Sequence, residues 1–236
     1  MSRVKMTSGF TIVELMLAMT FISMLLIAIA LTTIQISNIY NKGITLREVN
    51  QMGRNLSDEF QRNIANTVPF DVTPKVGNDP VSSKYVLHAG IGGRLCLGDY
   101  TYVWNFGEAL AGGTNIYNRY TDNNSPVRFA RVTDPSGGLC SNTTAQIDRS
   151  KAAELLSSGD RDLAVHAFSI QKTKEDPAIG QALYAISFTL GTNNQAQLMA
   201  NDASCRPPSD NIGDENYCAV NRFDIIARAG NSSGGK

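Results

Sequence analysis

The chain has no proline before Pro69, and only three of its 20 glycines precede that position. Because proline and glycine are the residues that most disfavour a helix interior, their scarcity permits an unbroken helix from about Thr11 to Asn66. Charge is missing as well, since no acidic or basic residue occurs from Leu15 to Asn41. A membrane crossing needs about 20 apolar residues, so this run suffices for one transmembrane helix. It is too long for the core of an ordinary secretory signal.

Groups that carry metal or catalytic chemistry are also scarce. Two histidines, His88 and His166, leave little material for a histidine-rich metal centre, and both lie in strand-like runs that favour packing roles. The segment Gly90–Leu95 (GIGGRL) lacks the third glycine of a dinucleotide-binding fingerprint, and no P-loop or HExxH motif occurs. We therefore expect no enzyme and no cofactor. The competing class, a membrane-anchored hydrolase, would need a cluster of acid, base and nucleophile that the sequence does not offer.

The formal net charge is zero, with 21 Lys and Arg against 21 Asp and Glu. This balance argues against nucleic acid held by a strong overall basic field. At the amino terminus, however, Arg3 and Lys5 are not accompanied by any acid. Basic residues on the short side of a membrane span place that side in the cytoplasm, so we expect the rest of the chain outside.

One acidic residue, Glu14, stands at the start of the apolar stretch. A carboxylate in or near hydrocarbon is costly and therefore indicates a function. Acidic residues are also favoured in the first turn of any helix, which is the simpler explanation.

The residues Gly9 to Leu15 (GFTIVEL) resemble the processing site of type IV prepilins, which type II secretion pseudopilins share. A short basic leader ends in glycine, an aromatic residue follows, and a glutamate is the fifth residue after the glycine. The resemblance implies cleavage between Gly9 and Phe10 by a prepilin peptidase and N-methylation of Phe10. It also implies that Glu14 pairs with the Phe10 amino group of a neighbouring subunit, because an unpaired carboxylate among packed helices is costly.

A chain of this family is a structural subunit of an extracellular filament that acts in pilus assembly, adhesion or twitching motility. Removal of the leader would leave 227 of the 236 residues, which is long for a major pilin and favours a minor, PilW-like pilin. The expected partners are the prepilin peptidase/N-methyltransferase, the other pilins of the filament, the inner-membrane assembly platform and the membrane. The expected location is the cell membrane, as a single-pass protein, and the extracellular pilus after assembly. A minor pseudopilin of type II secretion, or a competence pilin for DNA uptake, fits the same residues.

The pattern along the chain predicts an α+β fold, and the resemblance implies that this fold is pilin-like. After the leader, residues 1–9, we expect a transmembrane or filament-core helix at 10–39, its amphipathic continuation at 40–66 and an exported β-rich domain at 67–236. In the continuation, apolar positions recur at spacings of three and four, which lines one face of a helix. These positions are Leu46, Val49, Gly53, Leu56, Phe60 and Ile64. An antiparallel sheet packed on this stripe would complete the fold.

Short β-rich runs separated by turn residues predict the strands of the exported domain. The candidates are Lys84–His88, Arg94–Leu97, Tyr100–Asn105, Val127–Val132, Leu163–Thr173, Leu183–Leu190 and Ala219–Ala229. The segment between Leu163–Thr173 and Leu183–Leu190 contains Pro-Ala-Ile-Gly, which predicts a hairpin of these two strands. Lys151–Ser157 reads as a short helix, Thr67–Pro80 as a loop, and Asn231–Lys236 as a disordered tail. The aromatic residues Tyr100, Tyr102 and Trp104 favour a packing role.

All four cysteines follow the apolar run, on the side expected to be exported, where an even count implies disulfides. Three connectivities are possible, and we favour Cys205–Cys218 with Cys96–Cys140. The first pair encloses a polar loop that needs a crosslink, which contributes about 3 kcal/mol by loop entropy, and it resembles the disulfide-bounded carboxy-terminal region of many pilins. A zinc site is the alternative, but no CxxC occurs. Within the loop, Asp210, Asp214 and Glu215 are candidate calcium ligands, although a solvated loop explains them as well.

Overall fold

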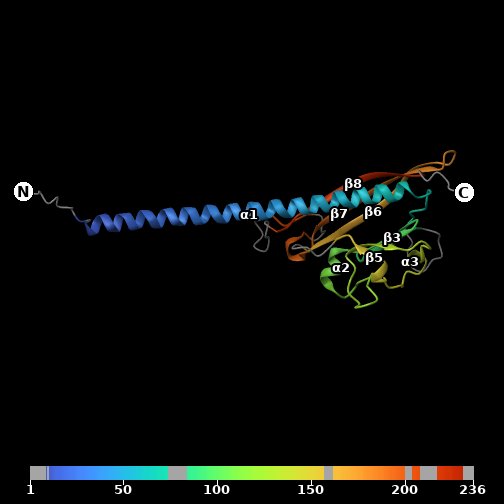
Figure 1. The fold of residues 1–236 in the computed structure, drawn as a ribbon, viewed down its shortest axis with the longest axis horizontal. Coiled ribbons are helices and arrows are strands. Elements are labelled where there is room, and N and C mark those ends of the chain that lie inside the picture. The colour runs from blue at the N-terminus through green and yellow to red at the C-terminus, as the bar shows by residue number, and fades with distance from the viewer. Residues whose placement is uncertain are drawn as a thin grey trace, which may run out of the picture. The chain divides into compact units, whose positions relative to one another are not determined.

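The structure is a computed structural model that describes residue 9 and residues 11–73, 84–156, 162–199, 204–207 and 217–230. The chain divides into two compact units, Met1–Asn41 and Lys42–Lys236. The first helix, α1 (Ile12–Ala65), begins in the first unit and ends in the second (Figure 1). Its bounds differ from the predicted ones by one residue at each end, and the fold is α+β as predicted.

The end of α1 is set by local chemistry. Thr67 donates both its backbone N–H and its side-chain hydroxyl to the carbonyl of Ile64, at 3.0 and 2.8 Å. These bonds satisfy a carbonyl that has no partner further along the helix. Val68 then precedes Pro69, and a residue before proline disfavours the helical conformation, so the helix cannot resume.

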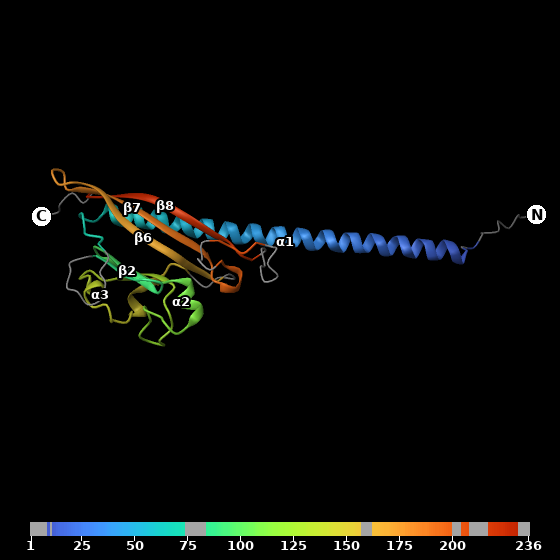
Figure 2. The same cartoon turned by 180° about the vertical axis from the view of Figure 1, so that it is seen from behind.

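The first five strands form one antiparallel sheet in the order β1-β2-β3-β4-β5. The strands are β1 (Tyr85–His88), β2 (Gly92–Leu97), β3 (Tyr100–Asn105), β4 (Phe129–Thr133) and β5 (Ala152–Glu154). The first four overlap predicted strands, and β3 has the predicted bounds. Two short helices, α2 (Gly107–Gly112) and α3 (Gly138–Ser141), lie on the face of this sheet that is turned away from α1 (Figures 1 and 2).

The predicted helix at Lys151–Ser157 is wrong. Lys151 ends a short 3-10 helix, η1 (Arg149–Lys151), and the following residues pair with the edge of β4, with Glu154 opposite Ala130. The sequence KAAELLS favours a helix locally, but pairing with the open edge of a sheet outweighs that preference. The Glu154 carboxylate also accepts hydrogen bonds from the Tyr120 hydroxyl and the Phe129 N–H, which tie this segment to the sheet.

The remaining strands form a second antiparallel sheet in the order β6-β7-β8, so the described residues make two sheets where the sequence predicted one. They are β6 (Leu163–Asp176), β7 (Gln181–Thr192) and β8 (Val220–Ala229), and a second 3-10 helix, η2 (Gln195–Gln197), follows β7. The predicted hairpin joins β6 and β7 through the turn 177–180. Residues 67–73 lie outside helices and strands, whereas residues 74–80 of the predicted loop and the predicted tail 231–236 lie outside the described residues.

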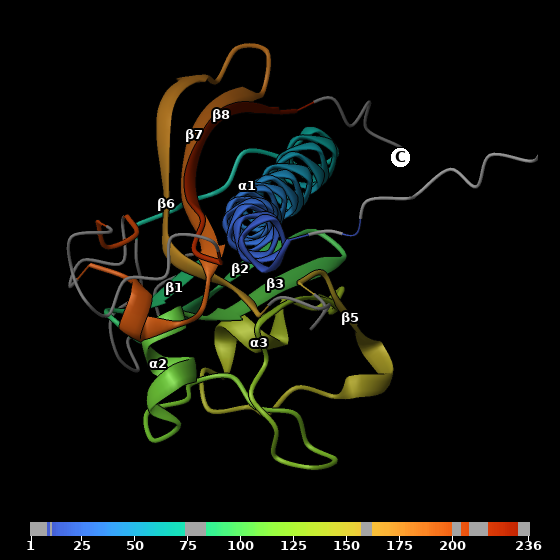
Figure 3. The same ribbon diagram turned by 90° about the vertical axis from the view of Figure 1, so that its left-hand side faces the viewer.

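The second half of α1 fits between the two sheets, which lie on different sides of the helix in the view along its axis (Figure 3). Phe60 occupies the centre of the core: its ring lies 5.0 Å from Tyr102 and 5.9 Å from Phe129 of one sheet, and 5.6 Å from Phe168 and 6.0 Å from Phe188 of the other. The predicted stripe therefore forms the core, as expected.

One position of that stripe differs from the prediction. Leu46 is 39% exposed, and Thr45, four residues before Val49, is fully buried in its place. Leu46 and Thr45 stand three and four residues before Val49, so both border the stripe, and the domain covers Thr45.

Candidate functional site

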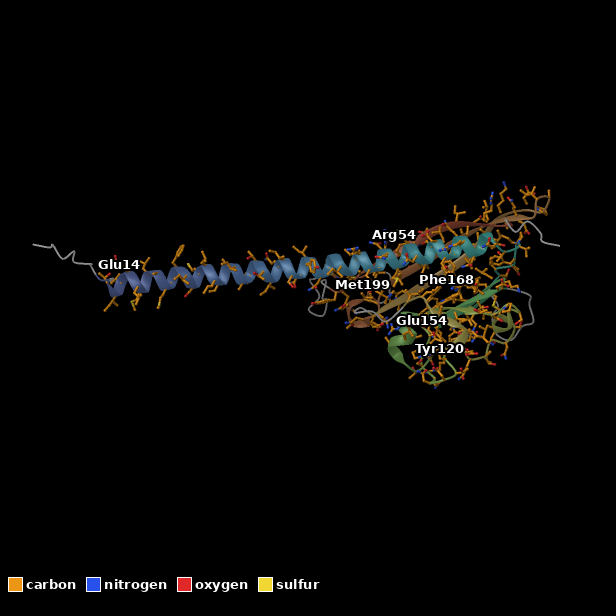
Figure 4. The ribbon with its side chains drawn as sticks, in the orientation of Figure 1. Glu14, Arg54, Tyr120, Glu154, Phe168 and Met199 are labelled. Carbon is orange, nitrogen blue, oxygen red and sulfur yellow. A yellow bond between two sulfur atoms is a disulfide. The ribbon has the colours of Figure 1, made fainter. Side chains whose placement is uncertain are left out.

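The start of α1 is a reciprocal cap formed by Thr11 and Glu14. Glu14 Oε2 accepts hydrogen bonds from the backbone N–H and the hydroxyl of Thr11, each at 2.9 Å, and the Glu14 N–H donates to Thr11 Oγ1 at 3.3 Å. This is the capping-box arrangement, in which two N–H groups that a helix leaves without partners are satisfied together. It gives Glu14 a definite place at the beginning of the helix (Figure 4).

The cap uses only one oxygen of the Glu14 carboxylate. Within the described part of the chain, Glu14 Oε1 takes part in no hydrogen bond, and the residue is exposed. Gly9 is also open, since a Cβ atom placed on it would meet no atom within 4 Å. Phe10 lies outside the described residues. Among the described residues, Gly9 and one carboxylate oxygen of Glu14 are thus open to contacts from outside the chain.

Beyond the cap, the surface of α1 is apolar and exposed. Every residue from 11 to 37 is exposed, including large side chains such as Ile12, with 78% of its surface accessible, and Met24, with 75%. Among the described residues, α1 is the one helix that is long and apolar enough to cross a membrane. Because exposed apolar side chains in water are unfavourable by about 25 cal/mol per Å², a surface of this extent needs lipid or protein around it.

The hydroxyl groups between residues 15 and 34 of this surface are bonded to the helix itself. Each of them donates to a carbonyl three or four residues earlier in the chain, at 2.8 to 3.1 Å. The donors are Thr20, Ser23, Thr32 and Thr33. A polar group without a partner in hydrocarbon costs several kcal/mol, so this back-bonding makes the surface compatible with an apolar environment.

The cysteines lie in the two pairs that the sequence analysis favoured. Cys96 of β2 is bonded to Cys140 of α3, and Cys205 to Cys218, with S–S distances of 2.01 and 2.10 Å. The candidate calcium ligands Asp210, Asp214 and Glu215 lie outside the described residues. In the described part of the chain no group of three His, Cys, Asp or Glu side chains is placed to hold a metal ion.

A charged contact that the sequence analysis did not identify links α1 to the first sheet. Glu59 Oε1 accepts from Arg131 at 2.6 Å, from the Tyr102 hydroxyl at 3.1 Å and from Asn63 at 3.0 Å. Burial, and next the charge of Glu59, raise the pKa of Tyr102 well above its usual range, so this hydroxyl stays a donor. In the sequence, the only indication that Glu59 contacts the domain is its position one residue before the buried Phe60.

The buried guanidinium of Arg94 was not predicted either. It is 1% exposed and donates to Asn118 Oδ1 and to the carbonyls of Leu139, Asn142 and Ala145, at 2.8 to 3.1 Å. Burial lowers the pKa of Arg94 from its ordinary value. Three of its four acceptors belong to the segment that begins with α3, so Arg94 and the Cys96–Cys140 bond fix the same segment.

The remaining candidate residues have packing roles. His166 contacts the carbonyl of Thr192 at 3.1 Å, and His88 lies against the Tyr117 ring, with 3.9 Å between ring centroids. Trp104 is fully buried in the main core. Tyr100 lies beneath the guanidinium of Arg131. The segment GIGGRL forms the end of a turn and the first four residues of β2.

Comparison of the chain with protein-family models, with curated proteins and with solved structures finds no match. The functional argument therefore depends on the residues themselves. Their most distinctive combination is an exposed apolar helix with a half-used carboxylate at its start, continued by an amphipathic stretch that is built into a two-sheet domain.

Proposed function

We propose that the chain is a structural subunit, most simply a minor pilin, of a type IV pilus-like extracellular filament. The observation that carries this proposal is the surface of α1, which is apolar and exposed over residues 11–37 and begins at Glu14. A plain membrane anchor would explain the apolar side chains. The helix cap explains why a carboxylate stands at the end of that surface, and its second oxygen leaves Glu14 able to accept from a partner outside the chain as well.

In the proposed sequence of events, α1 first anchors the precursor in the membrane, with the amino terminus in the cytoplasm. The prepilin peptidase cleaves after Gly9, which removes Arg3 and Lys5 and creates an amino group on Phe10. N-methylation of that group follows. The subunit then leaves the lipid for the filament with the help of the inner-membrane assembly platform, and its helix packs among those of other pilins.

Glu14 has two partners in this proposal. Its Oε2 remains bonded to Thr11 of its own chain, which holds the carboxylate at the helix start. Its Oε1 accepts from the Phe10 amino group of the subunit that is already docked. A charge without a counter-charge among packed helices is unfavourable, so pairing at this point favours one arrangement of neighbouring helices.

The test is the amount of this protein in sheared filaments relative to the amount in membranes. We expect Glu14→Leu to be cleaved and to stay membrane-bound, because removing a charge favours membrane residence, but to enter filaments several-fold less. Thr11→Val is the matched control: it removes the hydroxyl of the cap and keeps the carboxylate, so it should enter filaments almost like the wild type. Gly9→Val, with a larger residue at the cleavage site, should leave full-length precursor in the membrane.

Two results would contradict the proposal. An unchanged filament-to-membrane ratio for Glu14→Leu would remove the carboxylate from assembly. An equal loss for Thr11→Val and Glu14→Leu would mean that Glu14 acts only as a helix cap.

A further inference from the structure

A pocket of about 310 Å³ opens beyond the carboxy-terminal end of α1. Its walls come from the segment after the helix, from the turn between β2 and β3, and from the turn that precedes α3. The lining residues that matter for its chemistry are Asn66, Val68, Phe70, Lys84, Leu97 and Gly137. The volume is at the lower end of the range for small-molecule sites, about 300 to 1,000 Å³.

The segment after α1 is held rigidly in this pocket. The Tyr184 hydroxyl donates to the carbonyl of Phe70 at 2.8 Å and accepts from its N–H at 2.7 Å, and the two rings stack at 4.3 Å. On the other side, the N–H of Gly230 donates to the carbonyl of Thr67 at 2.8 Å. This wall is therefore already formed in the absence of a ligand.

The turn before α3 is held by one carboxylate. Asp134 accepts four hydrogen bonds, from Ser136 Oγ, the Gly138 N–H, the Leu139 N–H and Thr101 Oγ1, at 2.9 to 3.2 Å. With two bonds to each oxygen, its capacity as an acceptor is largely used. Asp134 thus fixes the turn.

The cation in the pocket is Lys84. Its Nζ lies 3.5 Å from the position that a Cβ atom on Gly137 would occupy, and Gly137 has a φ of +62°, which favours glycine. Among the residues that the structure describes, the Lys84 ammonium forms no hydrogen bond or ion pair, and the Asn66 carboxamide forms none either. Both residues are exposed, so their donors border the pocket and are open to a ligand that enters from solvent.

We propose that this pocket binds a small monocarboxylate with a compact apolar substituent. The Lys84 ammonium binds the carboxylate and the Asn66 carboxamide donates a second hydrogen bond. The substituent packs against Val68 and Phe70, of which Val68 is 69% exposed and Phe70 half-buried. The described lining offers a single cation, which suits a carboxylate, whereas phosphate, with up to two negative charges and more acceptor oxygens, calls for more donors than these residues provide. The proposal does not depend on filament assembly.

The experiment uses 3-phenylpropanoate as the probe and isothermal titration calorimetry on the full chain in lipid nanodiscs, with empty nanodiscs subtracted. We expect saturable binding to the wild type and binding at least about tenfold weaker for Lys84→Met, since a charge-assisted hydrogen bond is lost. Lys84→Arg should stay close to the wild type because it keeps the charge. Lys174→Met, on an exposed part of β6, is the control for loss of a lysine elsewhere. The neutral probe 3-phenylpropanamide should bind the wild type at least about tenfold more weakly than the acid.

Saturable binding that Lys84→Met weakens and Lys84→Arg restores would support the proposal. It would be overturned by the absence of binding to the wild type at millimolar probe, or by equal affinities of the wild type and Lys84→Met. Equal affinity for the acid and the amide would also overturn it, because the carboxylate would then contribute nothing. Thermal unfolding of each variant shows that the domain is folded, so a loss of binding is attributable to the pocket.

Discussion

Gly53 of α1 lies directly against the ring of Phe223 on β8, so closely that a Cβ atom on the glycine would overlap the ring. The missing side chain lets the helix approach the second sheet. A glycine inside a helix is normally unfavourable, by about 1 kcal/mol relative to alanine, so here the close contact with the sheet offsets the cost.

Replacement of this glycine should therefore lower stability. We expect Gly53→Ala to reduce the free energy of unfolding of the domain by about 1–3 kcal/mol, the usual range for overpacking. Gly43→Ala is the matched control, because a Cβ atom there meets nothing within 4 Å. It should be neutral or slightly stabilising in denaturant unfolding followed by circular dichroism. The double variant Gly53→Ala/Phe223→Ala should lose less than the sum of the two single losses, and strict additivity would contradict the proposed overlap.

The ion pair between Glu59 and Arg131 should contribute to the attachment of α1 to the first sheet. The Glu59 side chain is 15% exposed and that of Arg131 33%, so the pair is only partly screened by solvent. We expect Arg131→Met to lower the free energy of unfolding by about 1–2 kcal/mol. Arg222→Met, which breaks the solvent-exposed pair with Asp224, should have no measurable effect. Equal losses for the two variants would show that burial gives the Glu59 pair no advantage.

The two disulfides should differ in their contribution to stability. Cys96 and Cys140 are 44 residues apart and Cys205 and Cys218 are 13 apart. By loop entropy, removal of the first bond should cost about 4 kcal/mol and removal of the second about 3 kcal/mol. Paired Cys→Ala variants compared in chemical unfolding measure this difference, and a non-reducing peptide map of the wild type checks the connectivity. Crosslinked peptides that join Cys96 to Cys205 or Cys218 would contradict the pairing.

Acid should destabilise the domain in part through His88. Burial, and next the charge of Arg94, lower the pKa of this imidazole from its usual value near 6.5. The unfolded chain then binds the proton more readily than the folded one, so the free energy of unfolding falls as the pH drops below about 6.5. His88→Phe keeps a ring against Tyr117 and should weaken the pH dependence between pH 7 and 5. Identical slopes for variant and wild type in thermal unfolding at several pH values would refute this role.

The helix and most strands could be predicted from the sequence because their signals are local. The absence of proline before Pro69 permitted α1, and the spacing of its apolar residues identified the stripe that holds Phe60. The strand pattern between Tyr100 and Asn105 gave the bounds of β3. The start of β5 was missed because its conformation depends on the edge of β4, which is more than 18 residues away in sequence.

In the candidate site, too, contacts between neighbours in sequence could be predicted, whereas contacts between distant segments could not. The pairing of Thr11 with Glu14 follows from a four-residue motif, TIVE, whose members are neighbours on one helix turn. Arg94 gave no such signal, because its acceptors are carbonyl groups of residues 139, 142 and 145, and a carbonyl belongs to every residue. The pocket at Lys84 combines three separate segments, so it is visible only once the chain is folded.

The self-bonded hydroxyls of α1 bear on how this helix is able to move. Between Leu15 and Ile34 the only polar side chains are those whose hydroxyls already have a carbonyl acceptor in their own helix. Rotation of the helix about its axis, or sliding along it, breaks no polar bond and only exchanges van der Waals contacts. Polar contacts that could fix an axial register in the proposed filament therefore have to lie outside this segment, and Glu14, at its start, offers one such group.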